Sequence, residues 1–205
     1  MNKLRSGGKR LRIRVEPAAY IAAVYILISG ELYRIFIILT AVIIHELGHI
    51  AAARILRIKI TGIRLSLTGA KIETGGVFSY KKEILLCLAG PLFNVLAYIT
   101  AMPLRSVEII SSGVRDFCGI SLVLAIFNLL PIRGFDGGRI LYSTVALLSN
   151  VNAADTAITL TGSTIIAALW ITSIYMIIRY ESALSLFAFA ILMFFTVIFR
   201  SKDQS

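Results

Sequence analysis

Six apolar runs follow one another along this chain, and they set what it can fold into. Hydrophobic residues make up 58% of the 205 positions, above the ~45–50% of ordinary soluble domains. A helix of roughly 20 apolar residues is long enough to cross the hydrocarbon core of a bilayer. The runs lie at residues 17–29, 32–55, 84–102, 117–130, 158–178 and 183–199. We therefore expect an all-α polytopic membrane protein with about six transmembrane helices, embedded in the lipid bilayer.

The distribution of Lys and Arg, rather than their number, explains the net charge of +10. If the N-terminus is cytoplasmic, the basic residues before Val15 and those between Arg54 and Lys82 lie inside. Arg133, Arg139, Arg200 and Lys202 then also lie inside, and the basic residues left outside are Arg34, Arg105, Arg115 and Arg179. This is the positive-inside pattern of membrane proteins. We expect an integral cell membrane protein with cytoplasmic N- and C-termini and no nucleic-acid partner.

A small β-structure is expected between the second and third helices. Residues 58–73 alternate apolar and polar side chains, with Gly69 near a turn, which is typical of a hairpin. Residues 11–15 alternate in the same way and could add a strand. We expect a membrane-associated β-hairpin or sheet whose exposed edge could pair with an extended peptide.

The two histidines of the chain lie in the segment His45-Glu46-Leu47-Gly48-His49, inside the second apolar run. On a helix, residues i and i+4 share one face about 6 Å apart, so both imidazoles can reach one Zn²⁺. The adjacent Glu46 can act as a base on a bound water. Because ionisable residues at bilayer depth are costly and usually functional, the segment predicts a membrane-buried zinc site.

Tetrahedral zinc with one water needs a third protein ligand, and two acids qualify, Glu73 and Asp136. Glu73 lies in strand-like sequence, whereas comparable soluble enzymes place their third glutamate on a helix. The fourth apolar run meets Pro131 after about 14 residues, or ~21 Å, which is short of the ~30 Å core. The glycine-rich residues 133–138 follow and could aim Asp136 at the metal. We favour Asp136, with a turn at the cytoplasmic interface as the alternative.

Two asparagines are candidates for substrate binding or transition-state support, Asn94 and Asn128. Asn94 ends the segment Ala89-Gly90-Pro91-Leu92-Phe93-Asn94, whose proline frees backbone groups that need partners in the membrane. The alternative for each asparagine is an amide that packs helices together.

Three blocks of sequence resemble the site-2 protease family of intramembrane zinc metalloproteases. Residues 45–49 resemble the family's zinc helix, residues 89–94 its middle core helix, and residues 128–138 its Asn-x-x-Pro and Asp-Gly element. The resemblance covers about half of the chain. It implies that the metal ligands are His45, His49 and Asp136, that Glu46 is the catalytic base, and that the hairpin is similar to a sheet near the active site.

The resemblance also implies a domain organisation. We expect residues 1–205 to form a single membrane-embedded metalloprotease domain, with a catalytic core at about 32–141 and accessory helices at 17–30, 158–178 and 183–199. This layout looks most like the sporulation factor IVFB branch, whose members cleave a membrane-associated precursor of a transcription factor. That branch commonly carries a C-terminal CBS domain, which we do not expect here, and Arg133 stands where the family often has a second proline.

The expected activity is zinc-dependent hydrolysis of a peptide bond within or next to a transmembrane segment of a membrane-protein substrate. The site would lie in the cytoplasmic half of the bilayer, and membrane regulatory proteins are expected as further partners. The alternative from another class is a non-hydrolytic membrane zinc-binding or transport protein, which could spare Glu46. It is disfavoured because residues 158–178 and 183–199 hold no Asp, Glu, Lys, Arg or His that could form a second half-site. An inactive scaffold is disfavoured because each catalytic position is intact.

Overall fold

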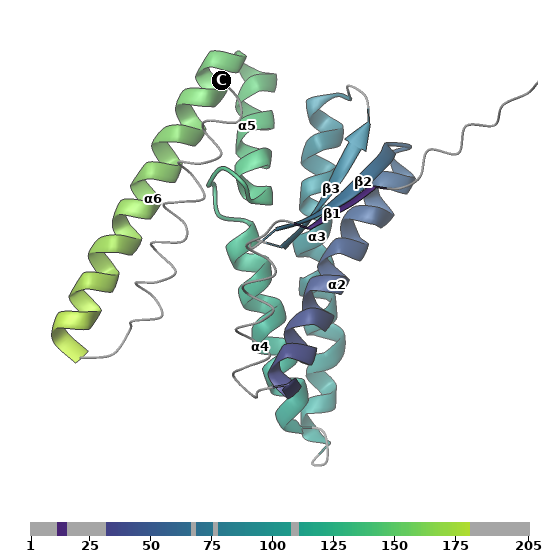
Figure 1. Ribbon diagram of the computed structural model, residues 1–205, viewed down its shortest axis with the longest axis vertical. Coiled ribbons are helices and arrows are strands. Elements are labelled where there is room, and N and C mark those ends of the chain that lie inside the picture. The colour runs from purple at the N-terminus through teal and green to yellow at the C-terminus, as the bar shows by residue number, and fades with distance from the viewer. Residues whose placement is uncertain (1–11, 16–31, 67–68, 76–77, 108–110, 181–205) are drawn as a thin grey trace, which may run out of the picture. The chain divides into compact units, whose positions relative to one another are not determined.

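The computed structural model of the protein describes residues 12–15, 32–66, 69–75, 78–107 and 111–180 (Figure 1). The helices expected at 17–30 and 183–199 lie outside these residues. The chain separates into two compact units. The first comprises residues 1–78 and 92–124, and the second comprises residues 79–91 and 125–205.

Helix α2 (Leu32–Ile55) belongs to the first unit and is apolar around its whole circumference. Its buried residues recur every three or four positions and form one stripe: Ile37, Ala41, His45, Gly48, His49 and Ala53. The remaining surface exposes large side chains such as Phe36, Ile43 and Ile55. A helix of this length with apolar side chains facing outward is suited to lipid.

A left-handed residue ends α2 and turns the chain toward the sheet. Arg57 has a φ of 55°. The N–H of Ile58 donates to the carbonyl of Ala53 at 2.8 Å, and the N–H of Arg57 donates to that of Arg54 at 3.2 Å. These two bonds form a Schellman motif, which satisfies carbonyl groups at a helix C-terminus.

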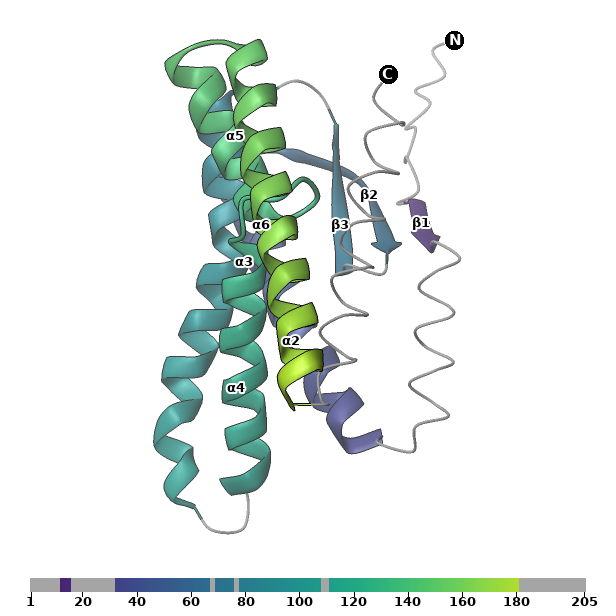
Figure 2. The ribbon, with the colours of Figure 1, turned by 90° about the vertical axis from the view of Figure 1, so that its left-hand side faces the viewer.

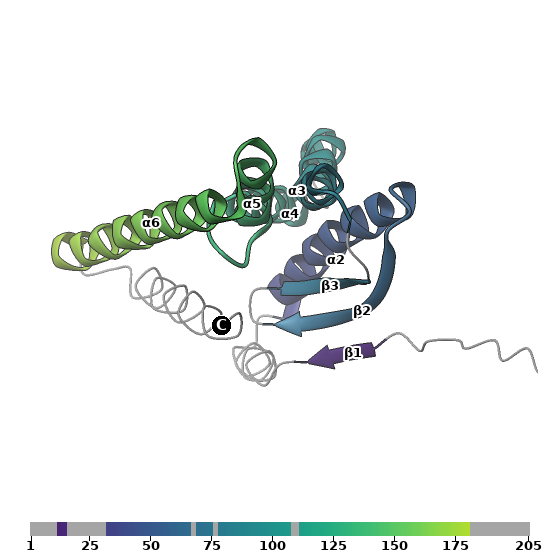
Figure 3. The same ribbon diagram turned by 90° about the horizontal axis from the view of Figure 1, so that it is seen from above.

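Three strands form one sheet in the order β1-β2-β3 (Figure 3). Strand β1 (Arg12–Val15) runs parallel to β2 (Lys59–Ser66), and β2 pairs antiparallel with β3 (Gly69–Gly75). The tight connection pairs Ser66 with Gly69, and a bulge interrupts the register between Ile60 and Gly62. Strand β3 lies against α2. Strands β1 and β2 fall within the segments 11–15 and 58–73 whose alternation predicted them, and β3 extends two residues beyond residue 73.

Helices α3 and α4 each contribute residues to both units. Helix α3 (Tyr80–Ala101) continues through Pro91 and runs into the short 3₁₀ helix η1 (Met102–Ser106), and α4 spans Ser111–Asn128. Within the first unit, the thiol of Cys118 on α4 donates to the carbonyl of Tyr98 on α3 at 3.9 Å. The two helices therefore run side by side there.

The second unit also contains α5 (Asp136–Leu148) and α6 (Val151–Tyr180), which pack against each other (Figure 2). Helix α5 was not anticipated, because its first residues Asp136-Gly137-Gly138-Arg139 are polar or flexible and the segment has no long apolar run. Helix α6 begins seven residues before the predicted residue 158. Within the described residues, three helical segments are long and apolar enough to cross a membrane: Leu32–Ile55, Tyr80–Ser106 and Val151–Arg179. The count of six crossings stays a prediction.

Candidate metal centre

His45 and His49 stand one turn apart on the buried stripe of α2. Their Nε2 atoms are 3.2 Å apart, and their ring planes meet at 84°. Two ligands at ~2.0–2.1 Å from one tetrahedral ion would stand about 3.3 Å apart. The side chains are 4% and 7% exposed. The pair therefore has the separation that shared coordination of one zinc ion requires, as the i, i+4 spacing predicts.

Glu46 follows His45 directly on α2 and is partly buried. Its Oε2 atom has almost no exposed surface. A carboxylate adjacent to an imidazole pair can exchange a proton with a water held by the same metal.

Asp136 is the first residue of α5 and is 8% exposed. An acidic side chain is favoured in the first turn of a helix, where the backbone N–H groups point outward and the dipole is positive. Phe135 occupies the N-cap without a capping side chain. The irregular backbone predicted before Asp136 is present, since residues 129–135 form turns and bends.

The two glycines after Asp136 allow this backbone to lie against the start of α5. A Cβ at Gly137 would collide with the carbonyl of Leu129, and a Cβ at Gly138 would collide with that of Ile132. Gly134 has a φ of 108°, in the region that favours glycine. The glycine content of the segment therefore follows from close backbone approach, and it fixes where α5 begins.

The donor set of His45, His49 and Asp136 fits zinc. Within the described residues, these three form a group of histidine and acidic side chains that could hold a metal ion. Two imidazole nitrogens and one carboxylate oxygen are a common protein ligand set for zinc with an open fourth position. Glu73, the other acid considered, falls in β3.

An ion pair that the sequence reasoning missed lies one turn from Asp136. Arg139 on α5 donates through Nε to Oε1 of Glu83 on α3 at 2.7 Å. Burial alone would lower the pKa of Arg139. Its electrostatic interactions with Cys87, Glu83 and Asp136 outweigh burial and raise that pKa. A cation in the first turn of a helix is unfavourable without an acidic partner, but because helix α5 was itself not predicted, no sequence pattern pointed to Glu83.

The pKa of Tyr142, on the same helix, is also raised. Burial is the main cause, and the nearby Asp155 and Tyr80 add to it, while Arg133 opposes it. Tyr142 therefore stays a neutral phenol at physiological pH.

The two candidate asparagines differ in their surroundings. Asn94 on α3 is fully buried, and neither its Oδ1 nor its Nδ2 has a hydrogen-bond partner among the described residues. A buried amide without a partner is costly, and no described residue partners the Asn94 amide. Asn128, the last residue of α4, is half-buried. Ser121 on α4 is likewise buried with an unpartnered hydroxyl among the described residues, and no sequence pattern had singled it out.

Comparison with known proteins gives similar sequences, although no protein-family model matches the chain. Stage IV sporulation protein FB of Bacillus subtilis is 33% identical over 135 residues, which cover 64% of this chain and 47% of that protein. The putative zinc metalloprotease Rip3 of Mycobacterium tuberculosis is 31% identical over 112 residues, covering 50% of this chain and 28% of that protein. The chain thus spans half the length of these relatives or less.

A solved structure has a similar fold over nearly the whole chain. The site-2 protease from Methanocaldococcus jannaschii superposes with a TM-score of 0.70 and 18% sequence identity, covering 95% of this chain and 91% of that one. The fold is therefore that of a multi-helix integral membrane protein. Together with the relatives in sequence and the His-His-Asp group, this fold makes the chain similar to the site-2 proteases.

Proposed function

We propose that this protein is an intramembrane zinc metalloprotease that hydrolyses a peptide bond within or next to a transmembrane segment of a membrane protein. The observation that carries the proposal is the pair of buried Nε2 atoms 3.2 Å apart on α2, a helix suited to lipid, with Glu46 between the two histidines. A site of this composition inside a membrane helix has little reason to exist without a metal.

In the proposed mechanism, His45, His49 and Asp136 hold the zinc ion. Bound zinc would polarise the scissile carbonyl and lower the pKa of a water towards ~7. Glu46 takes a proton from the attacking water and passes it to the amide nitrogen of the leaving chain. Glu46 thus returns to its carboxylate form when the C–N bond has broken.

Asn94 is our candidate for holding the substrate backbone or the developing oxyanion. Its unpartnered amide supports this role, because a peptide group could satisfy it when substrate binds. Asn128 is the second candidate, and its position at the end of α4, before the turn that leads to Asp136, supports it.

The substrate helix must unwind before hydrolysis, because a helical backbone uses its carbonyls in its own hydrogen bonds. Within the part of the chain that the structure describes, β2 is flanked on both sides, so the edges of the sheet that no described strand pairs with belong to β3 and β1. Because β3 lies against the zinc helix α2, we propose that the unwound segment pairs with β3.

The proposed cellular setting follows from the charge distribution and the relatives. We propose six transmembrane helices, cytoplasmic termini and a site in the cytoplasmic half of the bilayer. Because the sequence resembles the sporulation factor IVFB branch, and Stage IV sporulation protein FB is 33% identical over 135 residues, we propose regulated proteolysis of a membrane-associated transcription factor precursor, with membrane proteins as regulators.

The test compares the wild type with Glu46→Gln, and with Asp116→Asn as a control at an exposed acid on α4. Zinc content and cleavage of single-span substrates are measured for each purified protein. We expect Glu46→Gln to retain zinc while cleavage falls at least ~100-fold, the scale of a lost general base. We expect Asp116→Asn to keep both. Equal cleavage by Glu46→Gln would contradict the base assignment.

The same experiment distinguishes the protease from the alternative function, a membrane zinc carrier. A zinc carrier would keep transport in Glu46→Gln and would cleave nothing in the wild type. A wild type without zinc would contradict the metal centre itself.

A further inference from the structure

The position of Asp136 depends on the turn that precedes it, residues 129–135. This turn has few backbone hydrogen bonds of its own, including one from the N–H of Ile132 to the carbonyl of Leu130 at 2.8 Å and one from Phe135 to Ile132 at 3.2 Å. Gly134, two residues before Asp136, has a φ of 108°, a conformation that favours glycine. A turn of this kind needs support from neighbouring structure to hold one conformation.

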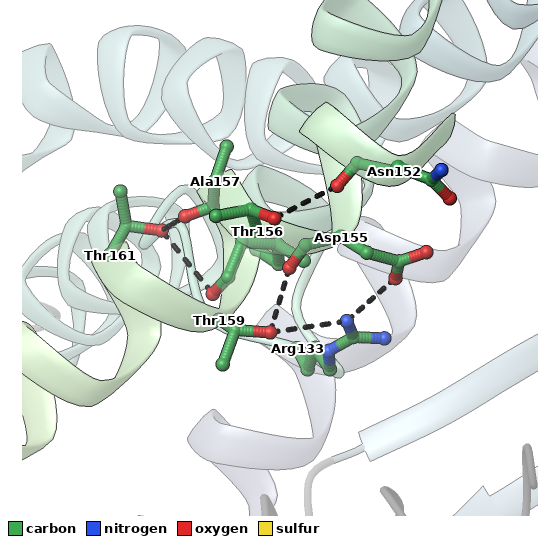
Figure 4. Close-up of polar contacts among 8 residues, drawn as sticks. Arg133, Asn152, Asp155, Thr156, Ala157, Thr159 and Thr161 are labelled. Carbon is green, nitrogen blue, oxygen red and sulfur yellow. Dashed lines mark hydrogen bonds and ion pairs between the residues drawn. The ribbon is translucent and has the colours of Figure 1, made fainter. Parts of the chain in front are cut away.

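Helix α6 supplies polar support on one side (Figure 4). Arg133 donates through Nη2 to Oδ1 of Asp155 at 2.7 Å and lies 3.4 Å from the hydroxyl of Thr159. The Thr159 hydroxyl donates to the Asp155 carbonyl at 2.7 Å, so its lone pairs are free to accept from the guanidinium. Arg133 is thus bound to two residues one helical turn apart.

A second polar contact joins the same helix to the turn two residues earlier. The hydroxyl of Thr161 lies 3.1 Å from the carbonyl of Pro131 and 2.9 Å from that of Ala157 in its own helix. Between the two polar contacts, Ile132 and Phe135 pack on Ile166 of α6 in a buried apolar cluster. Residues 131, 132, 133 and 135 therefore all meet one helix.

The ion pair is partly exposed, since the side chains of Arg133 and Asp155 are 27% and 48% exposed. A pair of this exposure adds little to global stability. Its effect is local, because Arg133 is three residues before Asp136 and the intervening Gly134 cannot hold the conformation by itself. Helix α6 also lies outside residues 32–141, where the resemblance to the family was found.

We propose that α6 is a positioning element of the metal centre, in which Asp155 and Thr161 hold the turn through Arg133 and Pro131 so that Asp136 is preorganised to bind zinc. This inference rests on the proposed function, in which Asp136 is a ligand. Arg133, Asp155 and Thr161 are positioning residues, since none of them is among the proposed ligands.

The variants that test it are Arg133→Gln, Asp155→Asn, their double variant and the charge exchange Arg133→Asp with Asp155→Arg. Thr161→Val removes the contact with Pro131. Thr164→Val is the matched control, because the Thr164 hydroxyl donates to the Leu160 carbonyl of its own helix at 2.8 Å and lies on α6 as Thr161 does. Each protein is purified in the same detergent as the full chain.

Two readouts follow each variant. The first is the rate of zinc release to a chromogenic chelator. The second is amide hydrogen exchange of residues 129–135 after zinc has been removed. We expect Arg133→Gln and Asp155→Asn each to release zinc roughly tenfold faster, the scale of lost outer-shell support, and to exchange faster in the turn. The double variant should be no worse than either single variant, and the charge exchange should recover part of the loss.

Thr161→Val should also increase the rate of zinc release and the amide exchange of residues 129–135. Thr164→Val should match the wild type in both measurements. Zinc release at the wild-type rate in Arg133→Gln and Asp155→Asn would overturn the inference while leaving the proposed protease intact. Absence of zinc from the wild type would overturn both this inference and the proposed protease. The wild type is measured first, so this result is known before any variant is made.

Discussion

Arg57 ends α2 in a backbone conformation that glycine adopts more easily. Its φ of 55° brings Cβ close to the following carbonyl oxygen. This contact costs roughly 1–2 kcal/mol for a residue with a side chain. Arg57→Gly keeps both Schellman hydrogen bonds and removes this strain. We expect the free energy of unfolding of the variant to rise by about 1 kcal/mol, so that it unfolds at a higher temperature.

The control is Arg54→Gly, in the last turn of α2, where the backbone is helical. There glycine should destabilise by about 1 kcal/mol. Thermal unfolding of both variants in one detergent measures the two effects. A lower midpoint for Arg57→Gly would show that the arginine side chain contributes more than the strained backbone costs.

Gly138, two residues after the proposed ligand Asp136, is one of two glycines at the start of α5 where the backbone approaches too closely for a side chain. A methyl group at this position meets the carbonyl of Ile132, and backbone atoms cannot move aside as a flexible side chain can. We expect Gly138→Ala to displace the start of α5 and to lower both thermal stability and zinc content.

The control is Gly119→Ala on α4, where a methyl group meets nothing within 4 Å. That variant should match or slightly exceed the wild type, since alanine favours a helix over glycine. Metal analysis and thermal unfolding compare the two. Zinc content in Gly138→Ala equal to that of the wild type would show that the turn can relax without moving Asp136.

At the scale of elements, the sequence predicts those features that depend on the spacing of residues close together in the chain. The i, i+4 spacing of His45 and His49 places their rings together on any helix, and strand alternation locates β2 and β3. Helix α5 was missed because its apolar positions are interrupted and its beginning contains two glycines, which read as a turn. The partners of Arg133 and Arg139 could not be found either, because Asp155 and Glu83 are distant in sequence and only the fold brings them near.

Strand β3 offers a test of substrate pairing. Adjacent residues of a strand direct their N–H groups to opposite sides, so of Lys71 and Ile72 one donates toward β2 and the other toward the free edge. A proline removes the donor at each position. We expect the proline at the outward position to reduce cleavage strongly while zinc content and thermal stability change little.

The proline at the inward position serves as the internal control, since it breaks a hydrogen bond between β2 and β3 and should lower stability as well. Cleavage, zinc content and thermal unfolding are measured for both variants, and the loss of stability identifies the proline at the inward position. If the variant that keeps its stability also cleaves as the wild type does, β3 is not the edge on which the substrate pairs.

At the scale of the whole molecule, the proposed ligands come from two helices far apart in sequence, α2 and α5. A metal that binds the folded chain and not the unfolded chain stabilises the fold by mass action, by about 2.7 kcal/mol when its free concentration is 100 times the dissociation constant. Removing zinc with a chelator should therefore lower the unfolding temperature, and adding zinc back should restore it.

His45→Ala and Asp136→Asn should each abolish this response to zinc, although the two residues lie 91 positions apart in the chain. Glu46→Gln should keep the response, because Glu46 moves a proton and is not a proposed ligand. Asp116→Asn should respond as the wild type does. Thermal unfolding with and without zinc measures all four variants, and a full response in Asp136→Asn would remove Asp136 from the ligand set and return the choice of third ligand to Glu73.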